Sequence, residues 1–233
     1  MTKDLIWVFT EEEKALVSSF VAKGRIEQEK NEKFAIIDFE NFYKLFTDDE
    51  RAVMEKYLTI DPAQAGYKPP FLGIEEPPAD LVSLKNQKIV DEKETYTIPT
   101  QYLPRNTFEA YGQLNRAMKN ELGKEVLVLY GYRSPARQVF IFFDILQGIY
   151  DFDFQKTIQR VCFPAWSEHV CPKKQAIDFT PQQGGASVDF DQTKEYQWLQ
   201  KNARQFGFYE SYPKDNNLDM MYEPWHWHHE THR

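Results

Sequence analysis

The chain has 233 residues, of which 42% are hydrophobic and 15% aromatic, so it is long and apolar enough to bury a sizeable core. Its formal net charge of −8 argues against nucleic acid as a partner, because a nucleic-acid-binding protein is expected to carry a basic patch. No apolar run reaches the ~20 residues of a membrane-spanning helix, and residues 1–7 lack the basic and apolar regions of a secretory leader.

The first 95 residues are predicted to form a helical N-terminal region with no recognisable catalytic motif. Thr10 is expected to cap the first helix and Gly24 to end it. The spacing of apolar residues predicts a helix over 11–23, a short strand or buried segment over 34–39, and a helical pattern over 40–58 that breaks at 47–50. Prolines then accumulate between residues 59 and 86, which indicates a linker or an irregular loop that wraps the surface. The alternative is that this stretch packs across the cleft and contributes to substrate selection.

Residues 96–233 are predicted to form a separate catalytic domain. Helices are expected over 108–122, from Pro135 onward, over 151–160 and over 193–206, and strands over 126–130, 176–180, 187–190 and 220–228. In the strand over 176–180, Asp178 is expected to point to a cleft and Ile177 to the core, since neighbouring strand residues face opposite ways. The predicted fold is α+β: a small, mostly antiparallel sheet with flanking helices and an added helical N-terminal region.

Two short stretches, Ser167 to Asp178 and Glu223 to His226, carry residue types that suit a metal-dependent hydrolase. Catalytic zinc sites usually have three protein ligands and leave the fourth position to water, and a nearby carboxylate moves the protons. His169, Asp178 and His226 can supply the ligands, and Glu223, three positions before His226, can supply the carboxylate. The helical motif His-Glu-x-x-His is absent, so the ligands must come from separate segments.

Several residues compete with this assignment. Four of the five histidines lie in the last eight residues, so a solvated histidine-rich tail that binds metal without catalysis is an alternative. His228 is a rival ligand, because residues 226 and 228 of an extended strand share one face. Asp189 and Asp191 are rival carboxylates, which we interpret as turn and helix-cap residues.

At these residues the chain resembles the zinc D-alanyl-D-alanine carboxypeptidases of the VanY type, within the LAS metallopeptidase family. The family pattern is Ser-x-His, a short gap, Ala-x-Asp and then Glu-x-Trp-His. The matching segments are 167–169, 176–178 and 223–226, with further likeness at 131–134, at Gln138 and over 198–213. The resemblance covers roughly residues 96 to 228, and four blocks in the right order make it specific.

The resemblance implies zinc as the cofactor and peptidoglycan stem peptides ending in D-Ala-D-Ala as substrates. It implies that Arg133 stabilises the substrate or the transition state, that Ser134 and Gln138 hold the substrate's end, and that Ser167 lies near the site, where orienting the loop is its alternative role. Trp225 is expected to be a packing residue, with a place in the lining of the substrate pocket as the alternative. From the residues alone, Arg133 also suits a surface salt bridge and Ser134 a helix cap. The family favours the cell envelope, whereas the absent leader pattern leaves the cytoplasm open.

The chain departs from the family in one place. His169 and Asp178 are nine positions apart, which makes the loop between them two residues longer than the family's. The longer loop leaves open a D,D-dipeptidase or an L,D-endopeptidase. A wall-binding or zinc-storing module without turnover is a separate alternative. Cys162 and Cys171 flank His169, and three states stay open for them: a disulfide, two free thiols, or Cys171 as a zinc ligand.

Overall fold

The structure of the protein is a computed structural model that describes residues 8–75, 77–90, 94–183 and 189–230. The chain forms two compact units, neither of them continuous in the sequence. The first unit comprises Met1–Ile74, Ser134–Ser167 and Asn217–Met221, and the second comprises Glu75–Arg133, Glu168–Asn216 and Tyr222–Arg233. The division into residues 1–95 and 96–233 stays a prediction. The leader region considered above, residues 1–7, lies outside the described residues.

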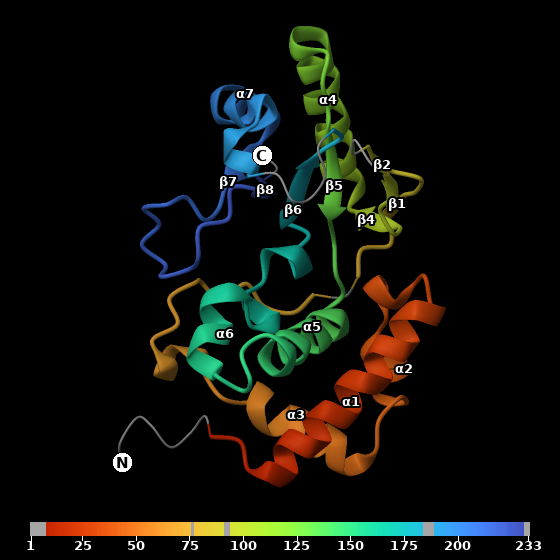
Figure 1. Cartoon of the computed structure of the whole chain (residues 1–233), viewed down its shortest axis with the longest axis vertical. Coiled ribbons are helices and arrows are strands. Elements are labelled where there is room, and N and C mark those ends of the chain that lie inside the picture. The colour runs from red at the N-terminus through yellow and green to blue at the C-terminus, as the bar shows by residue number, and fades with distance from the viewer. Residues whose placement is uncertain (1–7, 76, 91–93, 184–188, 231–233) are drawn as a thin grey trace. The chain divides into compact units, whose positions relative to one another are not determined.

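The first unit is helical (Figure 1). Its α-helices are α1 (Glu11–Lys30), α2 (Phe39–Tyr43), α3 (Asp48–Leu58), α5 (Pro135–Gly148) and α6 (Phe154–Arg160). Its short 3-10 helices are η2 (Phe34–Ile36), η3 (Pro62–Ala65) and η4 (Pro164–Trp166). The side chain of Thr47 caps α3, so the helical pattern breaks where the sequence predicted. The segment over 34–39 is the 3-10 helix η2 followed by the start of α2, and the strand considered for it was wrong.

Buried phenylalanines hold the helices of the first unit together. The ring of Phe20 on α1 meets Phe143 on α5 edge to face at 5.1 Å, and Phe142 meets Phe163 at 4.7 Å. All four rings are buried almost completely. Edge-to-face pairs of this kind add about 0.5–1.5 kcal/mol each to the area that they bury.

Helix α1 does not end at Gly24 as the sequence predicted, but continues to Lys30. Gly24 is buried against the ring of Phe140 on α5, and a Cβ atom at Gly24 would lie 2.3 Å from that ring. The glycine therefore permits the close approach of two helices. Glycine in a helical pattern favours a helix end, and a single sequence does not show that another helix packs against this position.

The second unit combines helices with three small antiparallel sheets. Its helices are α4 (Arg105–Leu122), η5 (Glu168–Val170), η6 (Phe190–Gln192), α7 (Lys194–Asn202) and η7 (Ala203–Phe206). The strand pairs are β1 (Val82–Leu84) with β4 (Gln101–Leu103) and β2 (Lys88–Val90) with β3 (Thr95–Thr97). The largest sheet has the order β5 (Val126–Tyr130), β6 (Lys174–Pro181), β8 (His226–Glu230) and β7 (Phe208–Glu210). The structure confirms the predicted α+β fold class.

One face of the four-stranded sheet packs against α4 and α7. Ile177 of β6 and Trp227 of β8 lie in this core with Leu114 of α4 and Leu199 of α7. Ile177 has no exposed surface, which confirms that it points to the core. The opposite face of β6 and β8 is left for polar side chains, and the candidate site is built there.

Two expectations for the strands differ from the structure. The last strand was expected over 220–228 but begins only at His226, because residues 223–226 form a turn first. The strand β7 was not predicted. The strand expected over 187–190 lies mainly outside the described residues, and Phe190 begins η6. Across the part of the chain that the structure describes, no helix is both long and apolar enough to cross a membrane.

The close contact at Gly24 gives a test of the first unit. We expect Gly24→Ala to lower the free energy of unfolding by about 1–3 kcal/mol, because the added methyl group must displace the buried Phe140 ring. Gly112→Ala on α4 is the matched control, since its Cβ would meet only the flexible end of Arg116 at 3.4 Å. The control should be neutral or stabilising by up to about 1 kcal/mol, from helix propensity. Urea denaturation measures both, and equal stability of the two variants would contradict the packing argument.

Candidate metal centre

The pairing of β6 with β8 places two candidate ligands together. Asp178 lies directly opposite His226 in the antiparallel register, while Ile177 lies opposite Trp227 on the core side. Directly opposed residues of an antiparallel pair project their side chains to the same face, within a few ångströms of each other. The carboxylate oxygen Oδ1 of Asp178 is 2.9 Å from Nδ1 of His226.

The third candidate ligand comes from η5, ahead of β6. Nε2 of His169 is 3.3 Å from Oδ1 of Asp178, and its Nδ1 is 2.8 Å from the carbonyl oxygen of Gly131. A carbonyl only accepts hydrogen bonds, so Nδ1 carries the proton and Nε2 presents its lone pair to Asp178. The backbone N–H of Arg133 also donates to the carbonyl of His169 at 3.0 Å, so β5 and η5 are joined at two points.

Gly131 is required at this junction. A Cβ atom there would lie 2.4 Å from the backbone oxygen of Tyr102, which cannot move aside as a side chain can. The N–H of Tyr132 donates to that same oxygen at 2.7 Å. The glycine at the start of the Gly-Tyr-Arg-Ser segment thus lets the chain approach β4 closely and hold His169 with its carbonyl.

The three side chains form a group that could hold a metal ion. One ligand atom from each of His169, Asp178 and His226 lies within 4.8 Å of the others, and all three residues are buried. Asp178 Oδ1 faces both ring nitrogens, yet it accepts no well-formed hydrogen bond from any residue that the structure describes. A buried carboxylate oxygen between two imidazoles without a hydrogen bond fits a cation, and two histidines with one carboxylate are ligands that zinc accepts.

The electrostatics of the group favour a positive charge. Burial opposes protonation of His226, but the negative charge of the nearby Asp178, together with Glu168, outweighs it and raises the pKa of His226 to about 10. Burial also opposes ionisation of Asp178, and the two histidines nevertheless hold its pKa well below the usual range. His169 differs, because burial and the Arg133 charge lower its pKa to about 4. At neutral pH, His169 is therefore a neutral imidazole, as a ligand must be.

Glu223 lies at the turn that precedes β8. Its Oε2 is 3.7 Å from Nδ1 of His226, the ring nitrogen that also faces Asp178, and the carboxylate is buried. The N–H of Glu223 donates to the carbonyl of Tyr212, and the N–H of His226 donates to the carbonyl of Glu223. The turn therefore fixes a carboxylate beside the three candidate ligands.

Trp225 belongs to the same turn but packs elsewhere. Its side chain is half-buried against the core of the second unit, and its carbonyl accepts from the N–H of Phe179 at 2.8 Å. Packing accounts for its conformation, and its contact with substrate stays a prediction.

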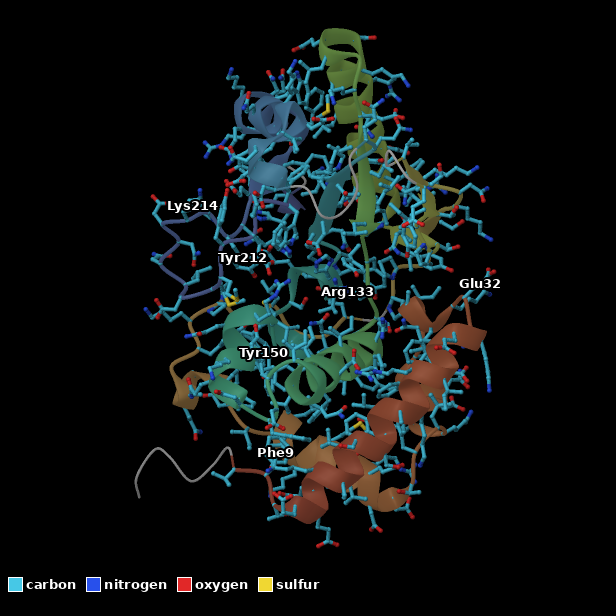
Figure 2. The ribbon with its side chains drawn as sticks, in the orientation of Figure 1. Phe9, Glu32, Arg133, Tyr150, Tyr212 and Lys214 are labelled. Atoms are coloured by element: carbon cyan, nitrogen blue, oxygen red, sulfur yellow. The ribbon has the colours of Figure 1, made fainter. Side chains whose placement is uncertain are left out.

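Arg133, which is labelled in Figure 2, follows β5 in the sequence and is held from two sides. Its guanidinium Nη2 is 3.7 Å from Oδ2 of Asp178, and its guanidinium carbon lies 5.1 Å from the centre of the Tyr130 ring. Tyr130 is paired with Asp178 after an irregularity in the register of β5, and its side chain is 48% exposed. A bulge of this kind can re-aim a side chain, and Tyr130 supplies a cation–π contact that the sequence analysis did not anticipate.

The rival residues are occupied elsewhere. His228 lies opposite Ala176, two positions further along β8, and its Nδ1 contacts the hydroxyl of Ser211 at 2.7 Å. Asp191 accepts hydrogen bonds from Gln192 and Tyr222. Among the described residues, the group of three that could hold a metal ion includes none of these rivals, and it includes neither cysteine.

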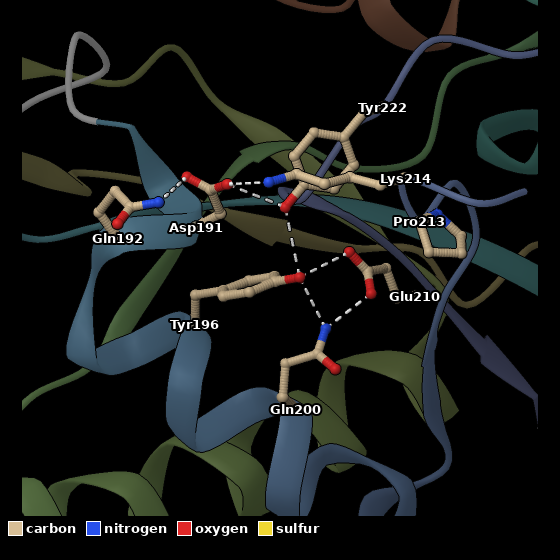
Figure 3. A pocket seen from close by; sticks show the side chains of 8 residues that line it. All are labelled: Asp191, Gln192, Tyr196, Gln200, Glu210, Pro213, Lys214 and Tyr222. Atoms are coloured by element: carbon tan, nitrogen blue, oxygen red, sulfur yellow. Dashed lines mark hydrogen bonds and ion pairs between the residues drawn. The ribbon is translucent and has the colours of Figure 1, made fainter.

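Asp191 lines a polar cavity of about 380 Å³ within the second unit (Figure 3). Hydrogen bonds link Tyr222 to Tyr196, and Tyr196 to Glu210. The full lining is Asp191, Gln192, Tyr196, Gln200, Glu210, Pro213, Lys214 and Tyr222. The cavity and the candidate centre share a segment of sequence, because Tyr222, which lines the cavity, directly precedes Glu223.

Three predicted substrate contacts belong to the first unit. Ser134 caps α5 by accepting from the N–H of Arg137, which is the capping role considered for it. Gln138 is buried and donates to the carbonyl of Cys162 at 3.0 Å, and Ser167 is buried as well. Their contact with substrate stays a prediction. Both cysteines are buried free thiols, and burial raises the pKa of Cys171.

Glu168 was missed as a functional candidate, although it sits between two quoted motif residues. It is buried, and its Oε2 lies 3.0 Å from Nε2 of His226, on the side of the ring away from Asp178. The sequence feature that could have identified Glu168 is that it is an acidic residue directly before the candidate ligand His169. No sequence pattern places Glu168 beside His226, which lies 58 positions away.

Two buried histidines and one aspartate with a glutamate beside them are residue types that suit a catalytic zinc site with three protein ligands. Comparison with known proteins gives the family. Residues 100–232 match the family described as VanY: D-alanyl-D-alanine carboxypeptidase. The chain belongs to this family.

The chain is also similar to individual proteins. The Bacillus subtilis (strain 168) protein named "Putative carboxypeptidase YodJ" is 33% identical over 156 residues, which cover 64% of this chain and 52% of that protein. The chain thus spans about half the length of this curated relative. The structure of the LdcB LD-carboxypeptidase matches with a TM-score of 0.51 and 27% identity, over 68% of this chain and 74% of that chain. VanYB in complex with D-alanine-D-alanine matches with a TM-score of 0.48 and 22% identity, over 56% of this chain and 73% of that chain.

The geometry distinguishes the two histidines that compete as ligands. We expect His226→Ala to bind zinc far more weakly than the unaltered protein, by more than the roughly 10–100-fold typical of losing an outer hydrogen-bond partner. His228→Ala, on the same strand face but turned to Ser211, should keep one zinc ion per chain. Competition with a chromogenic chelator and metal analysis after dialysis measure both. Equal zinc loss in the two variants would contradict the assignment.

Proposed function

We propose that the chain is a zinc-dependent D,D-carboxypeptidase that hydrolyses the terminal D-Ala-D-Ala bond of peptidoglycan stem peptides. His169, Asp178 and His226 hold the ion, and Glu223 is the catalytic acid and base. Membership of the VanY family supports the reaction class. The convergence of the three candidate ligands supports the metal.

The observation that carries the proposal is the position of Glu223. Its carboxylate lies 3.7 Å from the ring nitrogen of His226 that faces Asp178, so the base lies beside the candidate ligands. Metal storage requires no such group. A buried carboxylate next to a metal site has the geometry that proton transfer to and from a bound water needs.

Zinc, when bound, supplies a Lewis acid that polarises the scissile carbonyl and lowers the pKa of water to roughly 7. Glu223 accepts a proton from the water molecule that attacks the carbonyl carbon. The same carboxyl group then donates that proton to the nitrogen of the departing D-alanine. One residue thus serves as base and then as acid, as the overall proton balance of amide hydrolysis requires.

Arg133 is the residue proposed to bind the substrate's oxygen atoms. Its guanidinium is kept in place by the Tyr130 ring and by Asp178, and it is largely buried. A planar guanidinium donates two parallel hydrogen bonds to a carboxylate or to a developing oxyanion. Ser134 and Gln138 are proposed to help hold the terminal residue, and Ser167 and Trp225 to lie near it.

A second candidate function is cleavage of an L,D bond by the same machinery. The likeness to the LdcB LD-carboxypeptidase favours it. The bond that is cut depends on how the substrate's last residues are held, whereas the metal and the base serve both reactions. We place the enzyme in the cell envelope, where such stem peptides are found.

Replacement of the proposed base separates catalysis from metal binding. We expect Glu223→Gln to keep one zinc ion per chain and to lower kcat on a D-Ala-D-Ala peptide by about 10²–10⁴-fold, the usual contribution of a general acid–base group. Glu230→Gln, a more exposed carboxylate on β8, is the control and should hydrolyse normally. Release of D-alanine and metal content are measured together. Activity retained in Glu223→Gln would remove Glu223 from the mechanism.

Defined muropeptides decide which bond is cut. A D,D-carboxypeptidase should release one D-alanine from a pentapeptide stem and leave the tetrapeptide intact, since its subsite accepts a D-residue before the scissile bond. An L,D-carboxypeptidase should instead shorten the tetrapeptide, a dipeptidase should cleave free D-Ala-D-Ala, and an endopeptidase should cut within longer stems. Mass spectrometry of the products distinguishes these. If the protein binds wall sacculi in the presence of zinc but yields no product from any of these substrates, the proposed enzymatic activity is refuted.

A further inference from the structure

The imidazole of His226 is held at both of its nitrogens. Nδ1 lies 2.9 Å from Asp178 and Nε2 lies 3.0 Å from Oε2 of Glu168. The ring is buried between these two carboxylates. Rotation about the bond that joins the ring to the chain would break both contacts, so Glu168 and Asp178 together fix which nitrogen faces the candidate metal centre.

Glu168 is itself held by a chain of polar groups. The hydroxyl of Ser211 donates to Oε2 at 2.5 Å. A hydroxyl has a single proton, so the 2.7 Å contact between Ser211 and His228 is donated by Nδ1–H of His228. The ammonium group of Lys174 lies 2.8 Å from the other carboxylate oxygen, Oε1. Oε2 thus accepts from His226 and Ser211, while Oε1 faces Lys174.

The local fold makes this arrangement specific. Lys174 and His228 share the strand face that carries Asp178 and His226, because they lie four and two positions away from those residues. Ser211 follows β7, and its N–H donates to the carbonyl of His226 at 3.2 Å. Three segments therefore converge on Glu168, which precedes the candidate ligand His169 in η5.

We propose that Glu168 is a positioning residue for the metal centre: its carboxylate orients His226 so that Nδ1, and not Nε2, is presented beside Asp178. Ser211 and Lys174 keep Glu168 in place. This inference rests on the proposed function, since it assigns a role toward the zinc that His226 would hold. Outer carboxylates of this type fix the ring orientation of a ligating histidine and increase its strength as a donor.

A purely structural role for Glu168 makes a different prediction. A carboxylate that only ties η5 to β8 would change the stability of the metal-free protein and leave the affinity of the folded site unchanged. A positioning carboxylate changes the affinity and the ligand field. Zinc affinity, the visible spectrum of the Co²⁺-substituted protein and the thermal midpoint of the metal-free protein are therefore measured together.

We expect Glu168→Ala to weaken zinc binding by about 10–100-fold and to alter the Co²⁺ spectrum. Glu168→Gln keeps an acceptor oxygen and should fall between the alanine variant and the unaltered protein. Ser211→Ala, which removes one hydrogen bond to the carboxylate, should weaken zinc binding by a smaller factor. Glu230→Gln, which contacts His228 but not His226, is the control and should match the unaltered protein.

Each outcome decides the assignment. A folded Glu168→Ala protein with unaltered zinc affinity and Co²⁺ spectrum overturns the positioning role and leaves the proposed function standing. If that variant fails to fold, Ser211→Ala decides in its place: weakened zinc binding supports the role, and unchanged binding overturns it. An unaltered protein that binds no zinc overturns the proposed function, and the role of Glu168 with it.

Discussion

The candidate site depends on the antiparallel register between β6 and β8, which sets Asp178 directly opposite His226. A shift of either strand by one residue would turn one of the two side chains toward the core, because strand residues alternate between faces. The register is held from the core side, where Ile177 and Trp227 form the next pair and are buried. Hydrophobic packing on one face of the sheet thus determines the geometry of the polar group on the other.

The same face gathers charges that would be costly to bury singly. Glu168, Asp178 and Glu223 are buried carboxylates, and isolated carboxylates in a protein interior are strongly unfavourable. Lys174 lies beside Glu168 and Arg133 beside Asp178, so each of these two carboxylates has a cationic neighbour. His226 lies between both, and its raised pKa shows that the position stabilises a positive charge. These cationic neighbours offset the cost of burying the carboxylates, and a divalent cation held by the proposed ligands would be stabilised by the same negative charges.

The sequence predicted the helices and strands of the fold better than it predicted the contacts between them. Residues 126–130 form the predicted strand, and Gly123 and Gly207 end helices in the left-handed conformation that favours glycine. Gly24 suggested a helix end in the same way, but α1 continues past it. A glycine is needed at this position because the ring of Phe140, more than a hundred positions away, packs directly against its backbone. Local rules predict local structure, whereas a close approach between helices depends on the tertiary packing.

For the candidate site, the residue types and their order in the motifs were readable, and the partners across the fold were not. The contact of Glu168 with His226 joins segments 58 positions apart, whereas the Tyr130 ring lies only three positions before Arg133 and its contact depends on the local course of the chain after β5. Strand periodicity alone did not choose between His226 and His228, since a strand places both on one face, and the family resemblance was what favoured His226. The structure separates them by their neighbours: Asp178 for His226, and Ser211 for His228.

The longer loop between His169 and Asp178 shows how the fold accommodates a departure from the family pattern. The N–H of Cys171 donates back to the carbonyl of Glu168, and the N–H of Lys174 donates to the carbonyl of Cys171, so a compact turn lies ahead of β6. β6 then runs unbroken from Lys174, and its register with β8 is regular over the five pairs from Lys174 to Asp178. The turn keeps the loop's extra length out of this stretch of β6, so the loop can vary without displacing Asp178 from His226. The exposed Lys173 of this loop pairs with Glu75 at 2.6 Å, so the loop makes an ion pair on its outer side while Asp178 keeps its place opposite His226.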